Sequence, residues 1–196
     1  MISFIKNNKL FSLMILITLI TFFSGIVCSS ILDNETRKYI SKNISNIILN
    51  IKDRSIPTFS NYFKCFSNNS LYALSIWLFG ISIVGLPIVI FLYLLKVFLF
   101  SIEFIYLFIN IKQSNLLFIF IYLFPDIINI LILFILAYYS VSYSIFLFRV
   151  LFLKKSYSLH RITTKYLKVY LFCLLIFIIT SLLEILVIPK ILYYII

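Results

Sequence analysis

The sequence predicts an all-α, polytopic membrane protein with about five transmembrane helices and a possible re-entrant segment before the fourth. Of its 196 residues, 63% are hydrophobic and only 12% are charged. Soluble domains have nearer half apolar residues and about twice this share of charge. The apolar residues also occur in runs that approach the ~20 residues a helix needs to cross a bilayer. These observations exclude a water-soluble fold.

The first predicted span covers residues 10–32, and Lys6 and Lys9 precede it. A cleaved signal peptide is the alternative, but its apolar region would run only about 7–15 residues. The longer run favours a retained signal anchor. With the spans below, it places the whole chain, residues 1–196, in a single integral membrane domain.

A polar segment follows over residues 33–70, and we expect it to lie outside the cytoplasm. Its middle part predicts a short amphipathic helix that lies on the membrane surface or packs on the spans. The apolar face of that helix would consist of five isoleucines with helical spacing, namely Ile40, Ile44, Ile47, Ile48 and Ile51.

The second span is expected over residues 71–95, with Lys96 at its end, and contains two of the three glycines of the chain. In a water-exposed helix, Gly80 and Gly85 would each cost roughly 1 kcal/mol and Pro87 roughly 3 kcal/mol or more. In a membrane, neighbouring helices re-satisfy the freed backbone groups, and small residues allow close helix contacts. The pattern therefore predicts a packed and kinked transmembrane helix.

The remaining spans are expected at residues 97–111, 127–148 and 169–188. Pro125 and Asp126 interrupt an apolar run that is too long for one upright helix. The interruption predicts that residues 116–124 form a separate re-entrant or tilted piece. Non-helical backbone at that depth would have to be shielded by protein.

The orientation follows from the basic loop over residues 149–168, which contains six Lys or Arg and no acid. The positive-inside rule places this loop and the N-terminus in the cytoplasm. Segment 33–70 and the C-terminus then face outside, although that segment itself carries six Lys or Arg and three acids. Long loops have less weight in the rule.

The net charge of +11 does not indicate nucleic-acid binding, because the basic residues lie between apolar runs. A nucleic-acid footprint would require them on one soluble face. We expect no nucleic-acid partner, and we expect the basic loop 149–168 to attract anionic lipid.

No catalytic residues are predicted. The sole histidine, His160, lies in the basic loop without a second histidine, a cysteine pair or an acid nearby that would complete a metal site. The sequence has no intramembrane base for a Ser/His/acid set and no phosphate-cradling glycine loop. We therefore expect a protein that is not an enzyme and has neither metal nor cofactor.

Four charged residues lie within the predicted spans or directly beside them: Lys96, Glu103, Asp126 and Glu184. Each acid costs a few kcal/mol at bilayer depth, so it needs a partner, a proton or a function. One interpretation is a proton or ion pathway. The other is structural, with an acid bonded to backbone freed by Pro125 or paired with Lys96. Three acids without a dense polar lining make a poor conduction path.

Several features occur in a fixed order along nearly the whole chain: Gly25 in the first span, the run Ile76–Pro87 followed by Lys96, Pro125, the pair Lys154-Lys155, and Glu184 with Pro189 five residues later. In order and spacing they resemble the stage II sporulation protein M family. The sequence departs from the family pattern at Val97, where glycine is usual, and at Asp126-Ile127, where Gln-Asn is common.

The resemblance implies a non-enzymatic membrane scaffold of the bacterial cell membrane that acts in forespore engulfment. Such a scaffold anchors and localises peptidoglycan-degrading partners, which resemble stage II sporulation proteins D and P, at the septal or engulfing membrane. We expect segment 33–70 to be the contact surface for these cell-wall hydrolases.

Two alternatives remain open, because one membrane fold can host several functions. The first is a small transporter or channel subunit that uses Glu103, Asp126 and Glu184. The second is a permease-like partner of an ATPase that docks at loop 149–168.

Overall fold

The computed structural model describes residues 8–33, 35–42, 49, 59–110, 116–153 and 159–193. Within these ranges there are helices and no strands, which confirms the all-α prediction. The long helices are α1 (Asn8–Ile31), α3 (Phe59–Gly80), α4 (Leu86–Asn110), α5 (Leu116–Leu153) and α6 (Leu159–Leu182). Helix α6 continues through the π-helical turn η2 (Leu183–Val187) into α7 (Ile188–Tyr193). Residues 35–42 form a further short helix.

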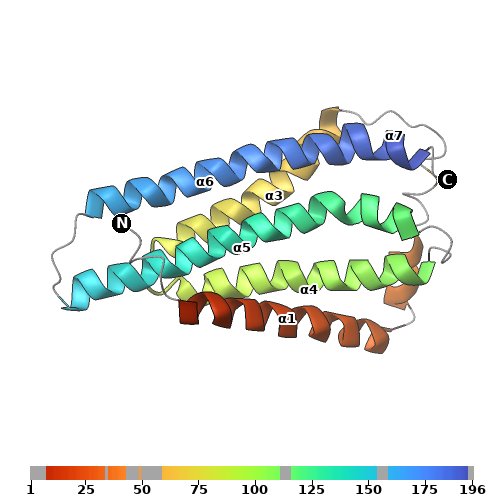
Figure 1. The fold of residues 1–196 in the computed structure, drawn as a ribbon. Coiled ribbons are helices and arrows are strands. Elements are labelled where there is room, and N and C mark those ends of the chain that lie inside the picture. Colours follow the sequence, from red (N-terminus) through yellow and green to blue (C-terminus); the bar gives the residue numbers. More distant parts are fainter. Residues whose placement is uncertain are drawn as a thin grey trace.

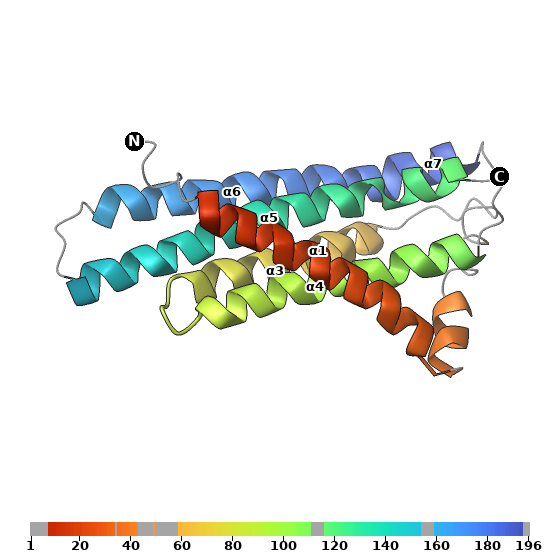
Figure 2. The same ribbon diagram turned by 60° about the horizontal axis from the view of Figure 1, so that its bottom comes forward.

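The long helices run alternately in opposite directions along one elongated bundle (Figure 1). Helix α1 begins at the end of the bundle where the α3–α4 turn lies and where α5 ends, and we call this the N-terminal end (Figure 2). Helices α1 and α4 end at the opposite end, where α7 also lies, and we call this the C-terminal end.

Four of the described helical stretches are long and apolar enough to cross a membrane, namely Lys9–Ile31, Leu86–Ile109, Leu116–Phe152 and His160–Tyr193. Helix α3 is more polar, because its first half contains serines, asparagines and a lysine. It contacts α4, α5 and α6. Two polar side chains of its first half, Cys65 and Asn69, lie against other helices, whereas Asn61, Lys64 and Asn68 are exposed.

The limits of the helices differ from expectation between residues 71 and 111. The chain leaves α3 at Gly80, turns over residues 81–85 and begins α4 at Leu86, so the expected span 71–95 is divided between two antiparallel helices. The turn lies at Gly80–Gly85, not at Lys96. Pro87 does not kink a helix, because it stands in the first turn of α4, where a backbone N–H has no partner within the helix.

The expected break at Pro125 is also absent from the structure. Residues 116–124 form the first turns of the single 38-residue helix α5, and Pro125 lies inside it. A proline removes one backbone hydrogen bond and crowds the preceding turn. Pro125 is fully buried, so neighbouring helices surround the local defect instead of lipid, and the helix continues.

The polar segment expected over residues 33–70 is shorter than predicted, because residues 59–70 belong to α3. Asn69, for example, is buried in the bundle. Of the isoleucines assigned to the amphipathic helix, only Ile40 lies within the described residues, where it belongs to the helix at 35–42. The rest of that prediction falls outside the described residues.

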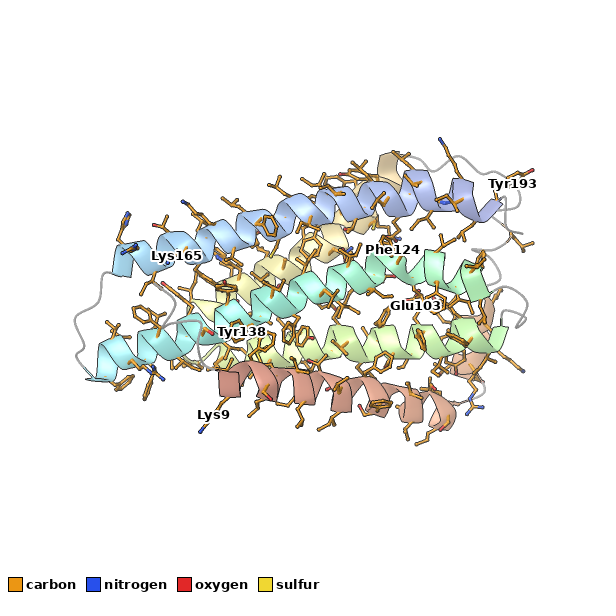
Figure 3. All side chains as sticks on the ribbon, in the orientation of Figure 1. Lys9, Glu103, Phe124, Tyr138, Lys165 and Tyr193 are labelled. Atoms are coloured by element: carbon orange, nitrogen blue, oxygen red, sulfur yellow. The ribbon has the colours of Figure 1, made fainter. Side chains whose placement is uncertain are left out.

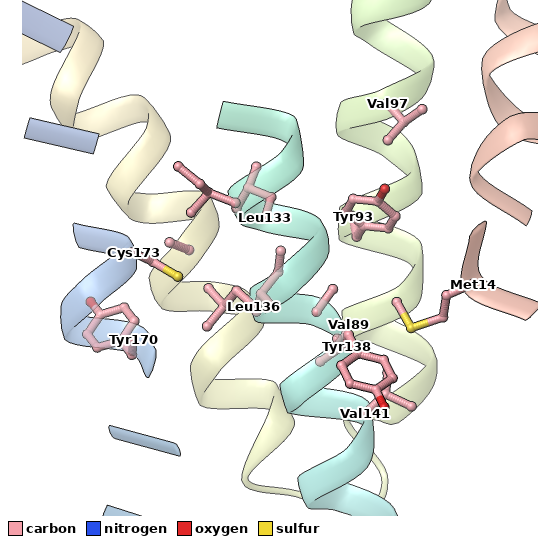
Figure 4. Close-up of a cluster of buried hydrophobic side chains, with 14 of the residues drawn as sticks. Met14, Val89, Tyr93, Val97, Leu133, Leu136, Tyr138, Val141, Tyr170 and Cys173 are labelled. Carbon is pink, nitrogen blue, oxygen red and sulfur yellow. The ribbon is translucent and has the colours of Figure 1, made fainter. Parts of the chain in front are cut away.

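Two apolar clusters fill the interior of the bundle. We call the larger one the central cluster; Figure 4 shows its core, where Met14 reaches from α1 towards α4 and Cys173 faces α3 and α5. The smaller one, the terminal cluster, lies at the C-terminal end and joins α4, α5 and α7. Its buried members are Tyr106, Leu107, Phe118, Ile119, Leu123, Ile188 and Leu192.

Helix α1 lies across α4 (Figure 2) and packs closely against it at Gly25. A Cβ atom at Gly25 would overlap the Oγ of Ser101 and would stand 2.9 Å from the backbone oxygen of Phe98. The absence of a side chain therefore allows this helix contact, as small residues do in membrane bundles. A hydrogen bond of 3.1 Å between Thr18 Oγ1 and Tyr93 Oη joins the same two helices.

We predict that Gly25→Ala lowers the stability of the bundle by about 1–3 kcal/mol, because overpacking at a close contact forces the helices apart. Ser101→Gly in the same chain should recover part of the loss, since it removes the overlapping atoms. Thermal unfolding in one mild detergent measures both effects. Ser24→Ala, at an exposed neighbouring position, is the control and should leave the midpoint unchanged. Equal midpoints for Gly25→Ala and the unaltered protein would contradict the prediction.

Candidate functional site: the intramembrane polar layer

A layer of polar side chains separates the central cluster from the terminal cluster. On α5, Asp126 and Asn129 lie between Leu123 of the terminal cluster and Leu133 of the central cluster. The same order recurs along the neighbouring helix, where Thr180, Ser181 and Glu184 lie between Phe177 and Ile188. Four helices contribute to this layer, which we call the polar layer.

Lys96 is the cation of the polar layer. It stands on α4, and its ammonium nitrogen lies 5.3 Å from the centre of the Tyr72 ring on α3, within the range of a cation–π interaction. The ammonium group also interacts electrostatically with three carboxyl groups, those of Glu103, Asp126 and Glu184. The structure thus brings together the four charged residues, which lie on α4, α5 and η2.

Glu184 lies in the π-helical turn η2 and faces α3. Its Oε2 accepts a hydrogen bond of 2.9 Å from the thiol of Cys65, and the same sulfur lies 3.7 Å from Ser181 Oγ. The wider turn is seen in the backbone bond from Ile188 N–H to Leu183 O, which spans five residues instead of four. Sequence reasoning assigned Cys65 to a polar loop and missed this contact.

Asn129 joins α5 to α6 inside the polar layer. Its exposed fraction is 0%, and its Oδ1 accepts a hydrogen bond of 2.7 Å from Thr180 Oγ1. Its buried Nδ2 interacts with the carboxyl group of Asp126, three residues earlier on α5. On the side of the layer nearer the C-terminal end, the Tyr122 hydroxyl lies 3.5 Å from Glu103 Oε1 and links α5 to α4. Figure 3 shows Glu103 between these two helices.

The chemistry of the polar layer is that of interhelical contact. Its polar atoms form hydrogen bonds or electrostatic contacts between α3 and α6, between α5 and α6, and between α4 and α5. Each helix thereby supplies partners that offset the free-energy cost of burying polar groups. Across the described ranges, no group of three or more His, Cys, Asp or Glu side chains is placed to hold a metal ion. His160 is exposed near the start of α6, far along the bundle from this layer.

A second polar contact, at the N-terminal end, was not predicted from the sequence. The last backbone carbonyls of α3 cannot be satisfied within the helix. The Tyr166 hydroxyl donates to Trp77 O at 2.8 Å, and Ser144 Oγ donates to Gly80 O at 2.8 Å. Ser140 Oγ shares a 2.7 Å bond with the same tyrosine hydroxyl. The sequence feature that indicates this contact is the spacing of Ser140 and Ser144, which stand four residues apart on one helix face.

Gly80 is part of this second contact. A Cβ atom there would overlap the Tyr166 hydroxyl and would lie 2.7 Å from Ser140 Cβ. The Trp77 ring stacks on the rings of Tyr166 and Tyr170, with centroid distances of 5.9 and 5.0 Å. The turn between α3 and α4 is thereby held against α5 and α6.

The features that the sequence shares with a known family therefore occupy defined places in the fold. Gly25 lies at the α1–α4 contact and Gly80 and Gly85 at the α3–α4 turn, while Lys96, Pro125 and Glu184 lie in or beside the polar layer. A model of the stage II sporulation protein M family matches residues 11–189. The chain belongs to the stage II sporulation protein M family. No curated protein and no solved structure gives a significant match.

Membership of the stage II sporulation protein M family confirms the resemblance seen in the sequence and indicates a membrane protein of sporulation. The match includes every residue of the polar layer and both contacts of the α3–α4 turn. It does not reach the last turn of α7, which lies beyond residue 189.

We predict that Lys96→Met destabilises the bundle by about 3 kcal/mol, because it leaves three acids without their cation. Asp126→Asn in the same chain should recover part of the loss, so the two changes should be coupled by about 1 kcal/mol or more. Unfolding in mild detergent, measured for both single variants and the double variant, gives this coupling. Lys165→Met, at an exposed site near the N-terminal end, is the control. Additive effects would show that Lys96 and Asp126 do not interact.

Proposed function

We propose that this protein is a non-enzymatic membrane scaffold that anchors and localises peptidoglycan-degrading partners during forespore engulfment. The observation that carries the proposal is the family match over residues 11–189. The cell-wall hydrolases expected as partners resemble stage II sporulation proteins D and P. The expected location is the cell membrane, at the septum or the engulfing membrane.

The use of polar groups within the bundle supports a scaffold. The bonds Cys65–Glu184, Thr180–Asn129 and Tyr166–Trp77 each join two different helices. Buried polar contacts of this kind fix the position of one helix relative to another. A bundle with such contacts along its length presents its two ends in a fixed arrangement, which suits the anchoring of other proteins.

The position of the exposed basic residues supports the membrane orientation expected from the sequence. Arg149, Arg161, Lys165 and Lys168 are exposed near the N-terminal end, and Figure 3 shows Lys9 and Lys165 there. The positive-inside rule then directs this end to the cytoplasm, where the basic residues meet anionic lipid headgroups. The C-terminal end faces the cell wall. The α1–α3 connection, residues 32–58, is therefore the favoured contact for the hydrolases in place of the longer segment 33–70.

We expect replacement of residues 43–58 by a Gly/Ser linker of equal length to abolish recovery of cell-wall hydrolases with the tagged protein. The full chain, tagged at its N-terminus, is purified in mild detergent from cells sampled through growth and sporulation, and co-purifying proteins are identified. The matched control replaces residues 154–158 at the opposite end by the same kind of linker. Undiminished hydrolase recovery with the first variant would place the contact elsewhere. Recovery of an ATPase at every stage would favour the permease-like alternative.

The competing transporter function makes a separate prediction. Removing all four charges of the polar layer at once avoids a lone buried charge, so the variant is Lys96→Met with Glu103→Gln, Asp126→Asn and Glu184→Gln. A scaffold carrying these changes should still recruit its partners, whereas proton-linked transport should be lost. Partner recovery from cells and proton flux in proteoliposomes measure the two activities. Proton flux in the unaltered protein that disappears in the variant would favour the transporter.

A further inference from the structure

A pocket of about 570 Å³ opens at the C-terminal end of the bundle. Three segments form it: the end of α1, the short helix at 35–42 and the end of α4. Its volume lies within the range of about 300–1,000 Å³ that small-molecule sites occupy. The pocket lies on the α1 side of α4, apart from the polar layer.

One wall of the pocket is cationic. It contains Arg37 and Lys38, both from the helix at 35–42, and the residues that line the pocket include no acid. Asp33 and Glu35 belong to the same segment of chain but do not line the cavity. The Arg37 guanidinium donates through Nη2 to Ser30 O. Its Nε–H is buried without a hydrogen-bond partner among the described residues, so it is available to an anionic ligand.

The wall formed by α1 presents hydroxyl oxygens. Ser29 Oγ donates its proton to Ile26 O at 2.6 Å, and Ser30 Oγ donates to Val27 O at 2.6 Å. Because both protons are engaged, each serine oxygen is left as an acceptor for hydroxyl groups of a ligand. An anionic ligand that carries hydroxyl groups therefore complements both walls, whereas an anion without hydroxyl groups complements only the cationic wall.

Five further residues complete the lining of the pocket: Ser41 and Tyr106, which carry hydroxyl groups, and three isoleucines. Ile26, Ile105 and Ile109 line it, and the exposed fraction of Ile109 is 72%. Ile31, at the end of α1, is 74% exposed. This apolar surface continues from the pocket along two membrane-spanning helices, in the direction that acyl chains take below a headgroup.

We propose that this pocket binds an anionic membrane lipid whose headgroup carries a phosphate and free hydroxyls, as phosphatidylglycerol does. Arg37 and Lys38 hold the phosphate, Ser29 and Ser30 accept from the headgroup hydroxyls, and the acyl chains lie along α1 and α4. Basic pockets between transmembrane helices bind anionic lipid headgroups on the cytoplasmic side of membranes, and the same pairing of charges applies to this pocket at the C-terminal end. The assignment is independent of the scaffold function, because it rests on the pocket alone.

The test uses the full chain in an uncharged detergent, with dioctanoyl phosphatidylglycerol as the probe and bound lipid counted by native mass spectrometry. Arg37→Gln with Lys38→Gln should weaken binding about tenfold or more, because two charges that face the phosphate are lost. Lys165→Gln with Lys168→Gln removes the same charge from exposed sites near the N-terminal end and should change binding less than twofold. Equal weakening in both double variants would overturn the proposal, since it would indicate attraction by net charge alone.

Three further probes separate the parts of the ligand. Dioctanoyl phosphatidic acid, which lacks the glycerol hydroxyls, should bind about threefold or more weaker than phosphatidylglycerol. Inorganic phosphate and glycerol 3-phosphate should compete poorly, because they lack acyl chains. Competition by either ion as strong as that of the lipid would overturn the lipid assignment and identify a free phosphate site.

Ser30→Ala keeps the test decisive if the double charge variant fails to fold. Ser30 is exposed, and the substitution keeps its backbone oxygen, which accepts the hydrogen bond from Arg37. The variant should reduce the preference for phosphatidylglycerol over phosphatidic acid while leaving the binding of phosphatidic acid unchanged. An unchanged preference would overturn the role assigned to the serine oxygens.

Discussion

The structure depends on one constraint: a polar group at bilayer depth must find its partner inside the protein. The polar layer meets this constraint across helices, with Lys96 on α4 facing acids from α5 and η2, and Cys65 on α3 bonded to Glu184. A slip of one helix by a single turn, about 5.4 Å, would move its polar group into an apolar cluster. The layer therefore sets the relative height of α3, α4, α5 and α6, which packing of similar aliphatic side chains alone would specify weakly.

The same constraint explains the position of α3. It is the least apolar of the long helices, and it stands where other helices accept its polar side chains and carbonyls. At one end, Cys65 and Asn69 point into the bundle. At the other end, Tyr166 and Ser144 bond to the carbonyl groups of Trp77 and Gly80. Each end of α3 is thus held by side chains from other helices, and the turn into α4 can be short because Gly80 allows that close approach.

The sequence was sufficient for the helical class and for the identity of the charged residues inside the helices, because both depend on local composition. It was insufficient for the helix limits. Gly80, Gly85 and Pro87 suit either a kink or a turn, and the choice is made by Ser144 and Tyr166, which are more than sixty residues away in the chain. Pro125 suits a break, but its burial lets α5 continue. The polar layer could not be assembled from the sequence, since its bonds join residues such as Cys65 and Glu184 that are 119 positions apart.

A bundle whose polar groups bond to each other presents mainly apolar side chains to the lipid, so specific contacts with other molecules are confined to its ends. At the C-terminal end, the lipid pocket and the proposed hydrolase contact share one segment, since Arg37 and Lys38 stand just before the rest of the α1–α3 connection. A lipid held by these residues and by α1 would fix the start of that connection at the membrane surface. A partner that binds further along the connection would then meet a segment restrained at the α1 end by lipid and at the α3 end by the bundle. Such restraint would lower the entropy lost when the partner binds, which would help the proposed scaffold to hold its partner at one place on the membrane.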